Sequence, residues 1–356
     1  MPRFKKLGEI QVARTWQQII VDQIKAGRAI PVLGNSISND LILGSHRQLI
    51  LDFAEGGKYP LVDKDNLAHL TQFMTIMGAM EAMEKQTNGV ITPVAVKQTY
   101  LDFVKTRLYS LAEAGGAARS LLDEVDAEFD NLDFSELAKH LGYPKFADTP
   151  QDDPLLILAG LDLPLYLTTG YHQVMEAALR QAGKQPHTGV CRWNEQLEKD
   201  IPDDIFAGGY EPSPEEPLVY HLHGLDKYPA SLVLTEDDHL EFLVAISREM
   251  GQPTDRIHAR IREALTQSSL LLLGYDLESW EFRTLFWGLL RFREVRRKDL
   301  KNVSVVHLQI ECCQEEQKYL QSYLGKANFE VFWMSAQEYV KKLFKALFGP
   351  SYDQSS

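Results

Sequence analysis

Four short apolar runs constrain the fold of this 356-residue chain most, because each of them breaks into glycine and polar residues. Such runs are typical of buried parallel strands, and the segments between them carry helical periodicity. The alternation predicts an α/β fold, a Rossmann-like doubly wound parallel sheet that binds ligands outside the carboxyl ends of its strands. The runs are Ile30 to Asp40, Leu165 to His172, Pro217 to Leu225 and Leu270 to Arg283.

Residues 41–150 are predicted to form a large all-helical insertion between the first two strands, because they show almost no strand-like alternation. The insertion lies within one predicted domain, residues 10–347, and a C-terminal tail, residues 348–356, follows it. Residues 182–217 carry most of the glycine and proline signals, and we interpret them as a loop near the site or a long surface connection. Further strands are predicted at residues 303–308 and 329–333.

Composition excludes several classes of function. The net charge of −13 argues against a general binder of nucleic acid, and no apolar run approaches the roughly 20 residues that a membrane span needs. The chain opens without the pattern of a signal peptide. Cys191, Cys312 and Cys313 form neither a zinc knuckle nor a disulfide framework. We therefore expect a soluble, cytoplasmic protein that needs no metal and contacts neither nucleic acid nor membrane directly.

The third apolar run carries the most reactive side chains. Its alternation predicts that His221 and His223 leave the strand on one face, and Gly224 then permits a sharp turn. A histidine with an ordinary pKa of about 6.5 can serve as a base near neutral pH. We interpret His223, beside the glycine, as that base and His221 as a structural histidine. The alternative is a metal site of both imidazoles completed by His239 or Asp237.

The first and last runs predict contacts with a nucleotide. The first is a strand, a small-residue loop and a helix start near Ser38, so that backbone N–H groups and the helix dipole favour an anion. In the last run, Gly274 permits close backbone approach to a dinucleotide, and Asp276 could accept a ribose hydroxyl. The alternative in both places is an ordinary turn before a capped helix, with Ser279 as the cap of the second.

Taken together, these motifs resemble the sirtuin-like family, specifically its bacterial branch in anti-phage defence. The resemblance rests on the loop 34–38, on T-T-x-Y at 168–171, on L-H-G at 222–224 and on L-L-G-Y-x-L-x-x-W-x-F-R at 272–283. It implies a Rossmann-type fold and an NAD+ hydrolase, or NADase, that releases nicotinamide and ADP-ribose. It also implies a homo-oligomer controlled by a sensor or activator protein.

The resemblance also gives roles to particular residues. It implies that His223 acts at the nicotinamide ribose. Gly170 stands where the family has an asparagine that contacts the ribose and helps to place the attacking water, and His172 is the candidate substitute. Because Gly170 offers no side chain, a non-catalytic NAD+ or ADP-ribose sensor, or a scaffold subunit, is the alternative function. The residues predicted to bind NAD+ are Gly34, Asn35, Ser36, Ser38, Thr168, Thr169, Gly170, Tyr171, Gly274, Tyr275 and Asp276.

Overall fold

Seven parallel strands form a single sheet in the order β3-β4-β2-β1-β5-β6-β7 in the computed structural model. This confirms the predicted doubly wound α/β fold. The structure describes residues 16–84, 93–201, 204–248, 252, 255–290, 306–310, 314–325 and 329–349. The strands are β1 (Ala29–Leu33), β2 (Leu165–Thr168), β3 (His187–Val190), β4 (Leu218–His221), β5 (Ser269–Leu273), β6 (Val306–Gln309) and β7 (Phe329–Phe332).

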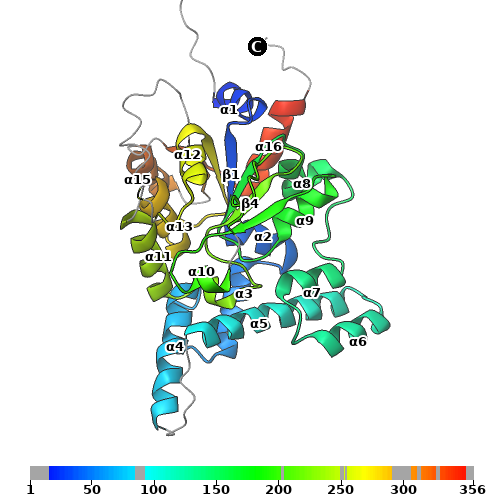
Figure 1. Ribbon diagram of the computed structural model, residues 1–356, viewed down its shortest axis with the longest axis vertical. Coiled ribbons are helices and arrows are strands. Elements are labelled where there is room, and N and C mark those ends of the chain that lie inside the picture. Colours follow the sequence, from blue (N-terminus) through cyan, green and yellow to red (C-terminus); the bar gives the residue numbers. More distant parts are fainter. Residues whose placement is uncertain are drawn as a thin grey trace, which may run out of the picture.

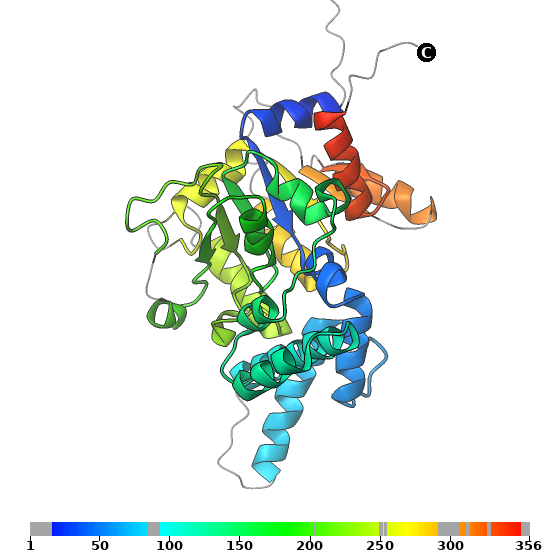
Figure 2. The same ribbon diagram turned by 90° about the vertical axis from the view of Figure 1, so that its right-hand side faces the viewer.

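Helices cover both faces of the sheet, which is why its strands are apolar on both sides (Figures 1 and 2). In β5, Leu271 and Leu273 enter one hydrophobic cluster, whereas Leu270 and Leu272 enter the other. The first face carries α1 (Trp16–Lys25), α8 (Pro154–Ala159), α9 (Val174–Gln181) and α16 (Ala336–Phe348). The second face carries α10 (Leu197–Asp200), α11 (Glu236–Arg248), α12 (Ala259–Gln267), α13 (Trp280–Leu285) and α15 (Gln314–Gly325).

The strand order reverses beside β1, at the centre of the sheet. The chain forms β2, β4 and β3 on one side of β1 and later returns to form β5, β6 and β7 on the other. Leu33, the last residue of β1, is in register with Thr168 of β2 and with Leu273 of β5. The loops after these three strands therefore begin at one level, and α/β proteins bind ligands in the crevice at such a point.

The insertion is helical in its described residues, 41–84 and 93–150, as predicted. Within the insertion a new helix starts after Asp133, which forms a capping box with Glu136. The insertion lies beyond the carboxyl ends of the strands (Figure 2). After α2 (Asn35–Ile42), its helices are α3 (His46–Gly56), α4 (Leu67–Glu84), α5 (Pro93–Ala114), α6 (Arg119–Glu128) and α7 (Phe134–His140).

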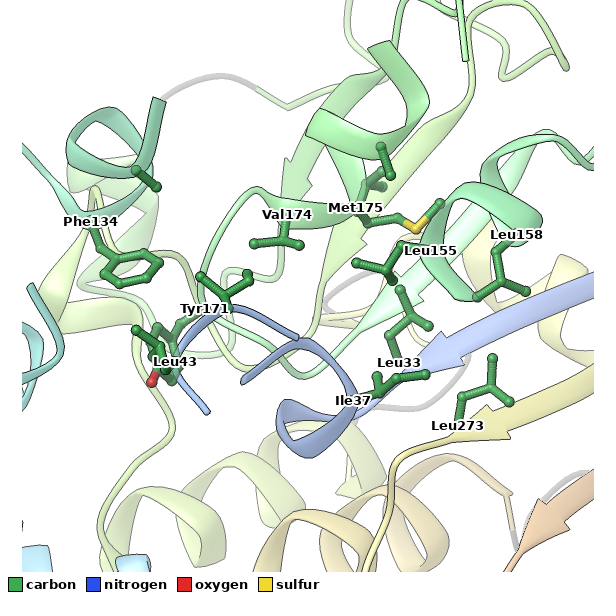
Figure 3. Close-up of a cluster of buried hydrophobic side chains, with 14 of the residues drawn as sticks. Leu33, Ile37, Leu43, Phe134, Leu155, Leu158, Tyr171, Val174, Met175 and Leu273 are labelled. Atoms are coloured by element: carbon green, nitrogen blue, oxygen red, sulfur yellow. The ribbon is translucent and has the colours of Figure 1, made fainter. Parts of the chain in front are cut away.

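The insertion and the sheet share one hydrophobic core. Figure 3 shows a cluster that runs from Phe134 of α7, past Leu43 and Ile37, to Leu33 and Leu273 at the strand ends. Phe134 and Leu33 are both 1% exposed. Burial of this apolar surface holds the insertion against the ends of the strands, where it can form part of a site.

Two details differ from the sequence-based expectation. Residues 182–217, expected to be irregular, contain the edge strand β3, which is short and only half-buried. β4 ends at His221, two residues earlier than its apolar pattern suggested.

Among the described residues, no helix has the length and apolar character to cross a membrane. The predictions for residues 10–15, 303–305, 350–356, Cys312 and Cys313 lie outside the described residues.

Candidate functional site

A cavity of about 430 Å³ opens at the carboxyl ends of β1, β2 and β5. Its walls come from the loops after these strands, from the segment after β4, and from the start of α3 and α4 in the insertion. The predicted site residues that line it are Asn35, Ser36, Thr169, Tyr171, His223, Gly274 and Asp276. The predicted residues that are not part of its lining are Gly34, Ser38, Thr168, Gly170, His172 and Tyr275.

The loops after β1 and β5 pack tightly against each other. An added Cβ at Gly34 would collide with the carbonyl oxygen of Gly274, and one at Gly274 would lie 2.7 Å from the backbone nitrogen of Ile37. Gly274 has a φ of +76°, which favours glycine. Ser36 Oγ donates to the Gly274 carbonyl at 2.6 Å. The close approach that Gly274 permits is therefore to the start of α2, whereas the sequence suggested an approach to a dinucleotide.

Glu281 of α13 joins the loops after β1 and β2. Its Oε1 accepts hydrogen bonds from Asn35 N at 3.0 Å and from Asn35 Nδ2 at 3.1 Å, and it also accepts the hydroxyl of Thr169. Tyr275 OH lies 3.0 Å from Thr169 Oγ1 on the other side. Burial raises the pKa of Glu281 to about 7, although the hydrogen bonds from Thr169 and Asn35 act in the opposite direction. Sequence reasoning missed Glu281, which stands inside the W-x-F-R motif.

His221 at the end of β4 and His223 just after it point to different surroundings, so the prediction that they share one face is wrong. His221 is the last residue of the strand and lies against α9. The turn that follows, with Gly224 at a φ of +90°, places the ring of His223 against Phe242 of α11 instead. The alternating pattern fails here because the strand ends before His223 is reached.

His221 is fully partnered. It donates from Nδ1 to the Gly170 carbonyl at 2.8 Å and from Nε2 to Glu176 Oε1 at 2.9 Å. Burial by itself would lower the pKa of His221, but the Glu176 carboxylate outweighs it and raises that pKa. His221 therefore holds the backbone of Gly170 in place, in agreement with its interpretation as a structural histidine.

His223, by contrast, has a ring nitrogen without a partner. The residue is 3% exposed, lines the cavity, and packs edge-on against His239 with ring centroids 5.4 Å apart. Its Nε2 is buried and has no hydrogen-bond partner among the described residues. Burial, and then the neighbouring His239, lower the pKa of His223 well below 6.5, so the ring is neutral at physiological pH. A buried polar atom of this kind costs free energy unless a ligand or water bonds to it.

The place beside Gly170 is close to the amide of Asn35 and to the ring of His172. A Cβ added to Gly170 would lie 3.8 Å from Asn35 Oδ1, an atom that is buried and has no partner among the described residues. His172 donates from Nε2 to Asn39 Oδ1 at 3.1 Å, and Asn39 Nδ2 lies 2.9 Å from Nδ1 of His46. His46 lines the cavity. His172 is therefore connected to the cavity through Asn39 and His46.

The insertion supplies a wall that sequence reasoning did not assign to the site. No spacing pattern could have revealed these residues, since they lie in a helical segment without a recognisable motif. They are His46, Arg47, Ile50, Asp63, Asp65, Asn66, Leu67 and Ala68.

The segment after β5 forms a turn that leads into α13. Asp276 accepts a hydrogen bond from Glu278 N at 2.9 Å, and Ser279 caps α13 by accepting from Phe282 N. The turn and the capped helix, which were the alternative to a nucleotide contact, are thus present, and their residues also line the cavity.

The metal site considered for His221 and His223 has no counterpart in the geometry. The two rings lie against different helices, and His221 uses both nitrogens within the protein. Across the part of the chain that the structure describes, no group of three or more His, Cys, Asp or Glu side chains is arranged to hold a metal ion.

Comparison with known proteins places this site in a family context. Residues 164–332 match the sequence model of the SIR2-like domain. The matched part extends from the start of β2 to the end of β7, whereas β1, α2 and the insertion precede it. No curated protein matches the chain. The match supports a sirtuin-like family and, since SIR2-like domains bind NAD+, an activity related to NAD+ in general.

Proposed function

We propose that this chain binds NAD+ in the cavity and hydrolyses it to nicotinamide and ADP-ribose, as an effector of bacterial anti-phage defence. The observation that carries the proposal is His223, which lines the cavity where the strand order reverses and whose buried Nε2 lacks a partner among the described residues. The SIR2-like match to residues 164–332 supports NAD+ as the ligand. The reaction and the biological role are further supported by the motif resemblance.

The reaction makes few demands on the protein. The bond between ribose C1′ and the nicotinamide nitrogen breaks, and its electron pair leaves with nicotinamide, which becomes neutral without a proton donor. A water oxygen then bonds to the oxocarbenium-like C1′ and gives up a proton. We assign His223 to accept a hydrogen bond from a ribose hydroxyl and to take up the released proton. Its lowered pKa keeps the ring unprotonated at neutral pH, so that it can accept this hydrogen bond, but the same shift makes the ring a weaker base.

The amide that the family places at position 170 has two candidate replacements in this proposal. Asn35 lines the cavity, and its Oδ1, which lacks a partner among the described residues, lies near Gly170. His172 would act indirectly, by fixing Asn39 and through it His46. We further propose that the chain works as a homo-oligomer in the cytoplasm and that a sensor or activator protein controls it.

Release of nicotinamide from NAD+ tests the proposal. The purified oligomer, alone or with its activator, should produce nicotinamide and ADP-ribose in equal amounts. His223→Ala should lower the rate by a factor of roughly 100 or more, as expected for loss of a general base. His140→Ala, at an exposed position on α7, is the matched control and should keep the full rate. Unchanged hydrolysis by His223→Ala would overturn the assignment.

The second candidate is a non-catalytic sensor that binds NAD+ or ADP-ribose, or a scaffold subunit. Gly170 favours this candidate, because it has no side chain to place a water molecule. Calorimetry would separate the two functions. Tight binding of NAD+ without any turnover, in the presence of every activator tried, would favour the sensor, whereas turnover would exclude it.

A further inference from the structure

We propose that Glu281 competes with the phosphate groups of the nucleotide for the start of α2, and that this side chain thereby sets the affinity of the cavity. The inference rests on the proposed function, since it concerns the same cavity. Glu281 is a determinant of ligand affinity in this proposal, and it takes no part in breaking the glycosidic bond.

The contacts of Glu281 are those expected of a bound anion. Oε1 alone accepts three donors, which are the backbone N–H and side-chain amide of Asn35 and the hydroxyl of Thr169. Asn35 is the first residue of α2, and the preceding Gly34 has no side chain that could cap the helix. Glu281 comes from 246 residues further along the chain to provide this acceptor. A carboxylate therefore already occupies the helix start that the sequence predicted as an anion site.

The cavity around this carboxylate is built to receive a further ligand. His223 Nε2 is buried, unpartnered among the described residues, and part of the same lining. Arg283, two residues after Glu281, also lines the cavity, and its guanidinium group makes no ion pair with any described residue. The lining of this cavity thus contains a cation, a polar atom without a partner among the described residues, and an anion position that the protein fills with its own side chain.

Phosphate and carboxylate oxygens cannot both accept the Asn35 N–H, and two anions at one helix start repel each other. The nucleotide must therefore move Glu281 aside before its phosphate can bond to the loop. This movement also breaks the hydrogen bond from Asn35 Nδ2 to Glu281. The Asn35 amide, whose Oδ1 lies near Gly170, then becomes available to the ligand. Removing the charge of Glu281 should make binding easier.

Binding of ADP-ribose, measured by calorimetry on the full chain, tests the proposal independently of hydrolysis. Glu281→Gln keeps the shape of the side chain and an oxygen acceptor but removes the charge, and Glu281→Ala removes the acceptor as well. We expect both variants to bind ADP-ribose roughly tenfold more tightly or better, the equivalent of one charge-assisted hydrogen bond no longer broken. With NAD+ as substrate, KM should fall while kcat changes little.

Glu278→Gln is the matched control, because Glu278 is exposed, lines the same cavity and has the same charge. It should leave the affinity for ADP-ribose unchanged. An equal gain in affinity would show that only the net negative charge of the cavity matters and would overturn the proposal.

Unchanged or weaker binding of ADP-ribose by both Glu281 variants would also overturn the proposal, since a direct contact between Glu281 and ribose predicts weaker binding. Tighter binding without nicotinamide release from any form would overturn the hydrolase assignment alone. No binding of ADP-ribose or NAD+ by any form would overturn both proposals.

Discussion

Two cavities in this protein differ in size and in the state of their polar groups. The larger, about 1130 Å³, lies beside β3 and β4, whereas the smaller, about 430 Å³, lies where the strand order reverses. In the larger cavity, Arg256 pairs with Glu198 at 2.5 Å and Thr188 donates to Glu176 at 2.9 Å. In the smaller one, His223 Nε2 lacks a partner among the described residues.

This comparison teaches that volume alone does not identify a binding site. A polar group that is already paired gains little from a ligand, because the new contact replaces an existing one. A buried polar group without a partner gains a full hydrogen bond when the ligand arrives. The smaller cavity, whose lining includes such a group, is therefore the better candidate for ligand binding.

The largest effect that would test this comparison is on stability, at Glu176. This fully buried carboxylate bonds to His221 at 2.9 Å and to Thr188 at the wall of the larger cavity. Glu176→Ala removes the acceptor of His221 Nε2 and the cause that raises the pKa of His221, so the ring must either give up its proton or remain a buried positive charge without its partner. We expect the free energy of unfolding to fall by about 3–5 kcal/mol, measured by urea denaturation.

Glu195→Ala is the control for this measurement. Glu195 also lines the larger cavity, but its side chain is 90% exposed and lies 3.8 Å from Arg256. Its removal should change the free energy of unfolding by less than about 0.5 kcal/mol. A comparably small change for Glu176→Ala would mean that pairing in the larger cavity does not stabilise the fold, and the contrast between the cavities would lose its basis.

A smaller effect is expected where the insertion meets the smaller cavity. Tyr171 lines that cavity, and its hydroxyl donates to the hydroxyl of Tyr100 on α5 at 2.8 Å. Tyr100→Phe removes the acceptor, so the buried Tyr171 hydroxyl loses a partner. We expect a loss of about 1–2 kcal/mol in the free energy of unfolding.

Tyr109→Phe, on the same helix, provides the matched control, because Tyr109 contacts Phe129 through its ring and its hydroxyl makes no hydrogen bond to any described residue. It should be neutral. If Tyr100→Phe were equally neutral, the hydrogen bond between Tyr171 and Tyr100 would not help to hold the insertion against the cavity. The position of the insertion would then depend on the shared apolar core alone.

The sequence predicts the frame of the site well, because the frame depends on local pattern. The apolar run at 270–273 is buried on both faces, as a central parallel strand requires, and the glycine after it marks the strand end. The edge strand β3 was missed because only Gly189 of its four residues is buried, so no apolar run signals it. The motif at 222–224 correctly indicated a histidine at a strand end but not the turn that separates it from His221.

The remaining parts of the site depend on contacts between distant segments. Glu281 reaches Asn35 across 246 residues, and no periodicity in either segment predicts that contact. His46 becomes a wall residue because the insertion folds back over the strand ends, and that depends on side-chain packing in the shared core. Local spacing could propose which residues carry chemistry, but only the fold decides which of them meet.

The smallest expected effect is the most direct test of which cavity binds the nucleotide. His258 lines the larger cavity, stacks on Phe206 at 4.1 Å between centroids, and caps α12 through Nδ1. His258→Asn removes the ring from the larger cavity but keeps a residue that caps helices well. Since its Nδ1 already accepts a hydrogen bond from Arg260 N, we expect the rate of nicotinamide release to stay within roughly twofold of the wild type. A loss comparable to that of His223→Ala would place the larger cavity in the reaction, and unpaired polar groups would then no longer distinguish the binding site.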